Sequence, residues 1–182
     1  MRFYICLAMV FYFFTGCSEK EPEKKAPLFE NLGTLEFPIT ITSELAQKYF
    51  NQGIKLTYGF NHAEAYRSFK ETSRLDTNCA MAYWGMALVL GPNINAAMDK
   101  GDVPTAYEAI QKAISLIDNE TEKEKDFIYA LSKRYSEKHL EDRTYLDSAY
   151  ADAMRKLSTK YPEDVNAATM FAESIMDLHP WD

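Results

Sequence analysis

The sequence contains little of what several common protein classes need. Its 182 residues include only seven Gly, seven Pro and three Cys, and so few turn-forming residues disfavour a loop-rich all-β domain. Basic residues are outnumbered, with 20 Lys and Arg against 27 Asp and Glu, so the net charge of −7 makes nucleic acid an unexpected partner. Signatures of catalysis are missing as well, because the chain has no HExxH, CxxC, phosphate-loop or Ser/His/Asp pattern. We therefore expect no enzyme activity, no cofactor and no metal site.

The apolar residues that are present gather at the N-terminus. Arg2 precedes an apolar run from Phe3 to Phe14, which is shorter than the roughly 20 residues of a membrane-spanning helix. A short basic region, an apolar stretch and a small residue before a cleavage point are typical of a secretory signal peptide. The residues Phe14-Thr15-Gly16-Cys17 resemble a bacterial lipobox, with Phe14 where Leu is usual. This resemblance implies cleavage before Cys17 and lipidation of Cys17, and the alternative is a plain secretory signal with an incidental Cys.

The segment after Cys17 is expected to be a tether. Residues 18–25 are mostly charged, with one Pro and no apolar side chain, which is typical of a disordered spacer. Ser18 directly follows the lipidated Cys, which in the sorting schemes of well-studied bacteria favours the outer membrane. We therefore expect a lipid-anchored protein of the bacterial cell envelope at the outer membrane. Because Cys6 would leave with the signal peptide and Cys17 would be acylated, Cys79 would have no partner for an intrachain disulfide.

From Thr42 onward, the apolar residues recur at helical spacing. Asn61 with Glu64 and Thr121 with Glu124 fit capping boxes at helix starts. These signals predict seven helices and no strand among them, over residues 42–58, 61–75, 79–90, 103–116, 121–135, 146–161 and 165–175. Before them, alternate residues from Leu35 to Ile41 are apolar, and we expect an extended segment lying on the first helix pair. Helix pairs with short turns favour an all-α stack in which neighbours complete each other's core.

Tyr49, Gly53, Ala65 and Phe69 form a pattern over the first two expected helices, and a second one starts 34 residues later at Ala80. These residues and this period resemble tetratricopeptide repeats (TPRs). An insertion of seven residues lies between Gly91 and Asp102, and the resemblance ends after three and a half repeats. It implies a TPR-like helix-turn-helix superhelix.

A narrower resemblance rests on three stretches. They are Tyr58–Ala65, Cys79–Gly85 followed by Leu90–Asn95, and the Met-Asp-Leu-x-Pro-Trp-Asp sequence at Met176–Asp182. Together they resemble the opening of a group of bacterial TPR proteins of no established activity, whose members continue beyond the last stretch. The resemblance implies the N-terminal portion of a longer protein. The chain then divides into a signal peptide (1–16), a flexible tether and extended segment (17–41), a helical array (42–177) and the start of a continuation (178–182).

The first helix of each pair lines the concave face of such arrays. That face should present Gln47, Phe50, Ile54, Met81, Trp84 and Leu88. These residues predict an apolar groove that binds an amphipathic helix or an extended peptide, with Trp84 and Phe50 as anchors. The alternative is that some of them pack against the third helix pair or the extended segment.

The resulting hypothesis is a membrane-anchored TPR protein that binds a protein or peptide partner through this groove. One alternative is an outer-membrane assembly scaffold that uses the convex face. Another is a metal or small-molecule site that includes His62 and His179 and is completed by residues beyond Asp182.

Overall fold

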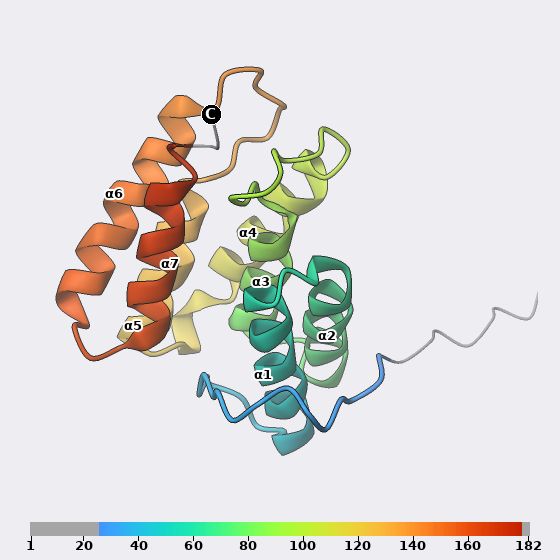
Figure 1. Cartoon of the computed structure of the whole chain (residues 1–182). Coiled ribbons are helices and arrows are strands. Elements are labelled where there is room, and N and C mark those ends of the chain that lie inside the picture. The colour runs from blue at the N-terminus through green and yellow to red at the C-terminus, as the bar shows by residue number, and fades with distance from the viewer. Residues whose placement is uncertain (1–25, 180–182) are drawn as a thin grey trace, which may run out of the picture.

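The computed structural model describes residues 26–179. The expected signal peptide, Cys17 and the tether up to residue 25 lie outside the described residues, and so do residues 180–182. Regular structure in the described part consists of seven α-helices and one short 3-10 helix, with no strand, so the expected all-α class is confirmed (Figure 1). The helices are α1 Glu44–Tyr58, α2 His62–Leu75, α3 Ala80–Leu90, α4 Val103–Ser115, α5 Glu122–Ser132, α6 Thr144–Lys160 and α7 Val165–Met176, with the 3-10 helix η1 at Ile117–Asn119.

Successive helices form a repeat-like stack. Helix α1 packs against α2, α3 against α4, and α5 against α6, while α7 lies on α6 (Figure 1). The pairs are joined because α2 packs on α3 and α4 on α5, and because α3 contacts both α1 and α5. Each pair therefore buries its apolar face against the next one, as expected for helical arrays.

Polar caps fix several helix starts. The side chains of Ser43, Asn61, Thr121 and Asp164 accept hydrogen bonds from backbone N–H groups in the first turns of α1, α2, α5 and α7. The capping box is complete only at Thr121 and Glu124. At the start of α2, the Glu64 carboxylate pairs with the Arg67 guanidinium, so the second expected capping box is only half formed. Arg67 lies one turn further along α2, where it competes for that carboxylate.

One aromatic ring sets the spacing of α1, α2 and α3. Phe69 of α2 is fully buried between Gly53 of α1 and Gly85 of α3. A Cβ atom would lie 2.5 Å from the Phe69 ring if added at Gly53, and 2.4 Å from it if added at Gly85. Both glycines are therefore required for the close approach of these helices.

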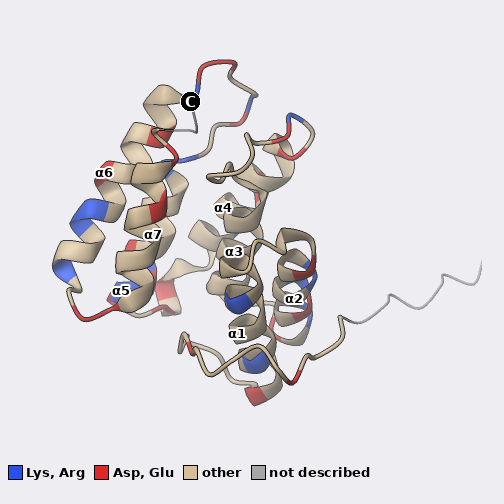
Figure 2. Cartoon of the chain, in the orientation of Figure 1, with Lys and Arg blue, Asp and Glu red and all other residues tan. Residues whose placement is uncertain are grey.

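Figure 2 shows acidic and basic residues interspersed along α2 and α6. Most of the charged residues that the structure describes are not buried, and the exceptions are Glu71, Glu120, Glu124 and Arg134. Among the described residues, no helix combines the length and the apolar content required to span a bilayer.

Candidate functional site

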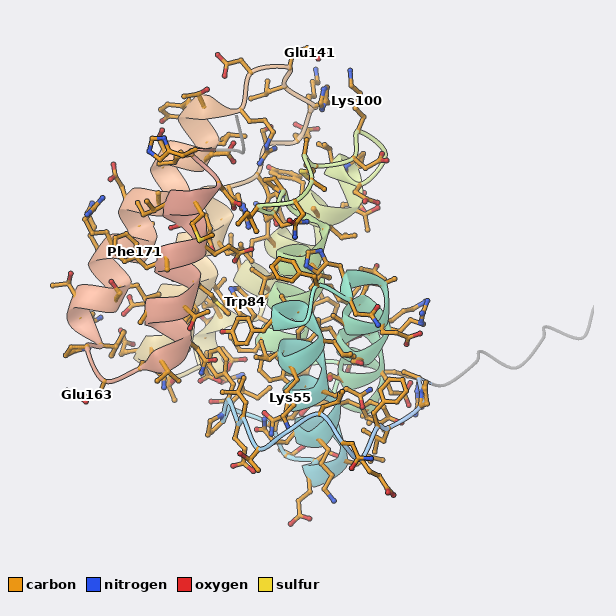
Figure 3. The ribbon with its side chains drawn as sticks, in the orientation of Figure 1. Lys55, Trp84, Lys100, Glu141, Glu163 and Phe171 are labelled. Atoms are coloured by element: carbon orange, nitrogen blue, oxygen red, sulfur yellow. The ribbon has the colours of Figure 1, made fainter. Side chains whose placement is uncertain are left out.

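The six residues predicted to line an open groove lie mostly in the core. Phe50, Ile54, Met81 and Trp84 are at most 1% exposed, and Leu88 is also buried. Gln47 alone is half-buried. Trp84 lies in the middle of the molecule, between the helix pairs (Figure 3). The open groove expected on this face is therefore absent from the described structure, and the prediction of its exposure is wrong.

The physical reason is that the chain itself covers this face. Residues 26–41, which we call the N-terminal segment, run in extended conformation along α1 (Figure 1). Phe37 of this segment is 1% exposed, and its ring centroid lies 5.7 Å from that of Phe50, 6.0 Å from that of Trp84 and 5.1 Å from that of Phe127. The pocket between the first, second and third helix pairs is thus filled by one aromatic side chain.

Helix α1 holds the backbone of the N-terminal segment through side-chain amides. Asn51 Oδ1 accepts a hydrogen bond from the Phe37 N–H at 3.0 Å, and Gln47 Nε2 donates to the Phe37 carbonyl oxygen at 3.0 Å. Gln52 accepts from the Phe29 N–H and donates to the Pro27 carbonyl oxygen, both at 2.8 Å. Because the backbone of an extended peptide has unpaired N–H and C=O groups, amide side chains can satisfy both kinds of group at once.

Sequence reasoning found Gln47 but missed Asn51 and Gln52. The three residues lie on one side of α1 at spacings of four and five. A row of amide side chains beside an apolar helix face was the signal that could have revealed the bound segment.

Two buried carboxylates lie near the other end of the segment, and one of them, Glu124, anchors it through Thr40. Burial acts to raise the pKa of Glu124, but hydrogen bonds from the hydroxyl and N–H of Thr121 and from the N–H and hydroxyl of Thr40 outweigh burial and lower this pKa. Glu120 accepts a hydrogen bond from the Ala80 N–H at 3.0 Å. Burial, followed by the nearby Glu124 charge, raises the pKa of Glu120 to about 7.

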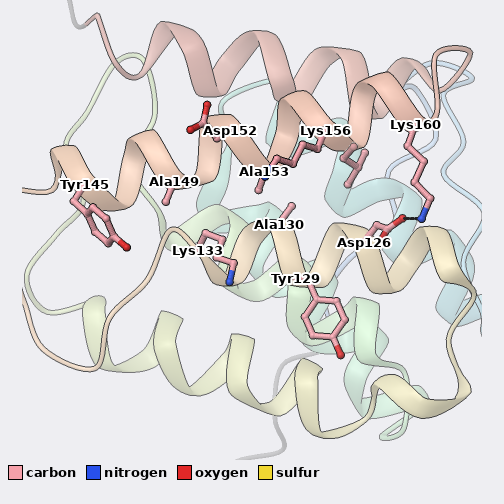
Figure 4. A pocket seen from close by; sticks show the side chains of 11 residues that line it. Asp126, Tyr129, Ala130, Lys133, Tyr145, Ala149, Asp152, Ala153, Lys156 and Lys160 are labelled. Atoms are coloured by element: carbon pink, nitrogen blue, oxygen red, sulfur yellow. Dashed lines mark hydrogen bonds and ion pairs between the residues drawn. The ribbon is translucent and has the colours of Figure 1, made fainter.

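An open depression lies on the outer surface between α5 and α6 (Figure 4). We call it the α5–α6 groove, and its volume is about 520 Å³. Its floor is made of small or apolar residues, namely Ala130, Ala149, Ala153 and Leu157. Tyr129 and Tyr145 line it and are 49% and 81% exposed, and Lys133, Lys156 and Lys160 line it as well. Lys160 pairs with Asp126 at 2.5 Å, whereas Lys133 and Lys156 have no carboxylate partner among the described residues.

A polar cluster lies near the C-terminal ends of α5 and α7, away from the N-terminal segment. The expected fifth helix was to continue through Tyr135, but α5 ends at Ser132. Arg134 and Tyr135 instead turn into the core, where the Tyr135 hydroxyl donates to the Ala87 carbonyl oxygen at 2.5 Å. The buried Arg134 guanidinium forms an ion pair with Asp177, just after α7, and lies 4.7 Å from the centre of the Tyr150 ring.

The histidines do not form a metal site among the described residues. His62 is half-buried, and its Nδ1 lies 3.4 Å from the Asn93 side-chain nitrogen, while His179 is exposed after the end of α7. Within residues 26–179, no group of three or more His, Cys, Asp and Glu side chains is arranged to hold a metal ion. Cys79 is buried, and burial raises the pKa of its thiol to about 12.

In comparisons with known proteins, no protein-family model, no curated protein and no solved structure matches the chain.

Proposed function

We propose that the chain is a lipid-anchored, TPR-like scaffold of the bacterial cell envelope that binds a polypeptide partner in the α5–α6 groove. The observation that carries this proposal is the contrast between the two apolar surfaces. The interior face holds the chain's own Phe37, whereas the α5–α6 groove is open and exposes two tyrosines.

The TPR-like character is supported by the order of helix packing and by the contacts of single residues. Phe69 and Gly53, which carry the resemblance in the first repeat, are in direct contact. The expected insertion within the second repeat corresponds to the long loop between Leu90 of α3 and Val103 of α4. Stacked helical pairs present extended surfaces, and many proteins use them to hold partners in a fixed arrangement.

The proposed anchor keeps the scaffold close to the membrane. Nine residue steps separate Cys17 from Ala26 (26 − 17 = 9), and nine extended residues span at most about 32 Å. Ala26 is buried, and its carbonyl oxygen accepts a hydrogen bond from the Tyr49 hydroxyl at 2.8 Å. Because Ala26 is hydrogen-bonded to α1, the lipid anchor at Cys17 would lie within about 32 Å of this helix.

The chemistry of the groove indicates the kind of partner. Exposed tyrosines supply large contact areas with few rotatable bonds, and such residues frequently dominate binding energies at interfaces. The small side chains of Ala149 and Ala153 leave room for an apolar side chain of a partner between α5 and α6. Lys133 and Lys156 would pair with carboxylates. We therefore expect a partner segment that combines an aromatic or aliphatic residue with Asp or Glu.

Site-specific photo-crosslinking in membranes tests this proposal. A photo-reactive amino acid at Tyr129 or Tyr145 should give the same crosslinked partner. The matched control is Leu45, a similarly exposed apolar residue on α1, outside the groove. Replacing Lys133 and Lys156 with Glu in the Tyr145 crosslinking variant should then reduce the crosslink about tenfold or more, because the charge of the groove is reversed. Equal crosslinking from Leu45, or no crosslinked polypeptide from either tyrosine, would reject the α5–α6 groove as the binding surface.

A second candidate is supported by the contacts of Asn51, Gln47 and Gln52. These side chains hold an extended peptide mainly through its backbone, so the interior face could accept a partner peptide in place of the N-terminal segment. A synthetic peptide of residues 26–41 should then bind to the full chain and perturb Trp84, and a peptide with Phe37→Ala should not. No binding of either peptide would leave this face with a structural role alone.

A further inference from the structure

A second cavity has a volume of about 340 Å³ and is lined by three segments that are distant in the sequence. These segments lie at the helix ends that are far from the N-terminal segment (Figure 1). The α3–α4 loop contributes Pro92, Asn93 and the residues up to Met98. Arg143 and Asp147 belong to the start of α6, and Asp177 follows the end of α7. We call this the polar cavity. It is separate from the α5–α6 groove, with which it shares no lining residue.

Two arginines organise the polar cavity. Arg134 is 1% exposed, donates to the Pro92 carbonyl oxygen at 2.7 Å and pairs with one oxygen of Asp177. Arg143 donates to the Arg134 carbonyl oxygen at 2.8 Å and to Asp147 Oδ1 at 3.2 Å. Because their guanidinium groups are held by backbone and carboxylate oxygens, the position of each carboxylate is fixed before any ligand arrives.

One acceptor in this arrangement has no partner, and neither do two donors, Arg134 Nε and Arg143 Nε, among the described residues. The Asp177 side chain is 4% exposed and lines the cavity, and its Oδ1 has no hydrogen-bond partner among the described residues. A buried carboxylate oxygen normally accepts at least one hydrogen bond, since leaving it without one is costly. A group that donates an N–H or O–H to Asp177 Oδ1 would therefore be stabilised in the polar cavity.

The local charge indicates which donor fits. The cavity and its surroundings hold two guanidinium groups, those of Arg134 and Arg143, and three carboxylates, those of Asp147, Asp177 and Glu173. Glu173 of α7 is included because its charge acts on both Arg134 and Asp177. Glu173 has no ion-pair partner among the described residues, so the surroundings of the cavity carry one negative charge in excess. The described side chains do not form a metal-ligand set, which leaves an organic cation as the complementary species. Ile94, Ala97 and Met98 offer an apolar wall for its hydrocarbon part.

From this geometry we infer that the polar cavity binds a small organic monocation, a primary ammonium or guanidinium compound whose N–H donates to Asp177 Oδ1. The alkyl part of the ligand lies against the α3–α4 loop, and Asp147, which also lines the cavity, adds negative charge to its wall. The inference does not depend on the proposed scaffold function, because the groove and the cavity have no residue in common.

Calorimetric titration of the full chain with three probes tests the inference. n-Butylammonium carries both the charge and the N–H donors, butyltrimethylammonium carries the charge without an N–H, and n-butanol carries no charge. We expect saturable binding of n-butylammonium and binding of butyltrimethylammonium that is weaker by about tenfold or more, since it cannot hydrogen-bond to Asp177. We expect no measurable binding of n-butanol. Equal binding of the two cations, or no saturable binding of n-butylammonium, would overturn the inference.

Variants locate the binding to the cavity. Asp177→Asn should abolish n-butylammonium binding, but it also removes the partner of the buried Arg134, and the variant protein could fail to fold. Glu173→Gln leaves the hydrogen bonds and ion pairs of Arg134, Arg143, Asp147 and Asp177 in place and removes one negative charge, so it should weaken binding about fivefold or more. The matched control is Glu163→Gln, which removes the same charge at the opposite end of α7, on the exposed turn before it (Figure 3). If Glu163→Gln weakens binding as much as Glu173→Gln does, the effect is one of net charge and the assignment of the site is wrong.

Discussion

Replacing Phe37 with Ala should detach the N-terminal segment from the interior of the stack. Phe37 is the side chain of this segment that lies between Phe50, Trp84 and Phe127, and it is 1% exposed. A buried Phe replaced by Ala typically costs about 3–5 kcal/mol, because transfer free energy is lost and a cavity remains. The three ring pairs are part of this cost, at roughly 0.5–1.5 kcal/mol each. The hydrogen bonds from Asn51, Gln47 and Gln52 to the backbone of the segment do not depend on the Phe37 ring and oppose its detachment, so we expect a loss of about 3 kcal/mol, near the lower limit.

Two measurements separate local detachment from a general loss of stability. Urea unfolding followed by circular dichroism gives the change in the free energy of unfolding. Trp84 fluorescence reports the interior directly, and a Trp181→Phe background leaves Trp84 as the only Trp in the chain. If the segment detaches, Trp84 emission should shift to the red and acrylamide should quench it before the helices unfold.

Leu28→Ala is the matched control, because Leu28 belongs to the same segment and is exposed. It should change the free energy of unfolding by less than about 0.5 kcal/mol and leave Trp84 emission unchanged. If Phe37→Ala costs no more than this control, then Phe37 does not fill the interior and the account given for the closed groove is refuted.

Three further predictions concern the core. Gly53→Ala should destabilise the protein by about 1–3 kcal/mol in urea unfolding, since its Cβ would lie 2.5 Å from Phe69, whereas Gly59→Ala, with 3.4 Å to the nearest atom, should be tolerated. Because the folded-state pKa of Glu120 is about 7, above the usual 4.5, its contribution to stability is fully present at low pH and is lost as the pH rises from about 4.5 to 7. The loss should amount to about 3 kcal/mol, and Glu120→Gln should flatten this part of the pH profile; an unchanged profile would contradict the pKa shift. In a variant whose Cys6 and Cys17 are replaced with Ala, Cys79 should react with a maleimide only in denaturant, because it is 2% exposed and its thiol pKa is about 12; rapid labelling of the folded protein would contradict this.

The helices were predictable because their signals are local. Caps such as Thr121 and Asp164, together with apolar spacing, act within a few residues of the helix they start. The end of α5 was not predictable in the same way. Tyr135 continues the apolar pattern, yet its hydroxyl bonds to Ala87, which is 48 residues away in the sequence, and this contact draws it out of the helix. Tertiary contacts outweigh local propensity at such positions.

The alternative left open by the sequence, that this face packs against the extended segment or the third helix pair, is the one that the structure shows, since Phe37 and Phe127 both lie against Trp84. Phe50 and Trp84 both point into the interior, where their ring centroids lie 6.3 Å apart. Whether such a face is open depends on a segment that precedes it, and the alternating pattern of Leu35, Phe37, Ile39 and Ile41 does not reveal which of them is inserted. No local sequence pattern predicts the polar cavity, because Arg134 and Asp177, which form its ion pair, are 43 residues apart in the sequence.

The proposed anchor and the position of the N-terminal segment together predict the orientation of the molecule. The N-terminal segment lies by the helix ends that include the start of α1, and the polar cavity lies toward the opposite helix ends, where the α3–α4 loop and the end of α7 meet (Figure 1). A short tether at Cys17 should therefore hold the cavity away from the membrane. Glu163 and Lys100, both exposed, lie toward these opposite ends (Figure 3). A fluorophore attached at Glu163 should therefore be quenched more strongly by a quencher in the lipid headgroups than a fluorophore at Lys100, and Cys17→Ala should abolish the difference. Equal quenching at the two positions in the anchored protein would show that the N-terminal segment does not face the membrane. The prediction that the polar cavity faces away from the membrane would then be wrong.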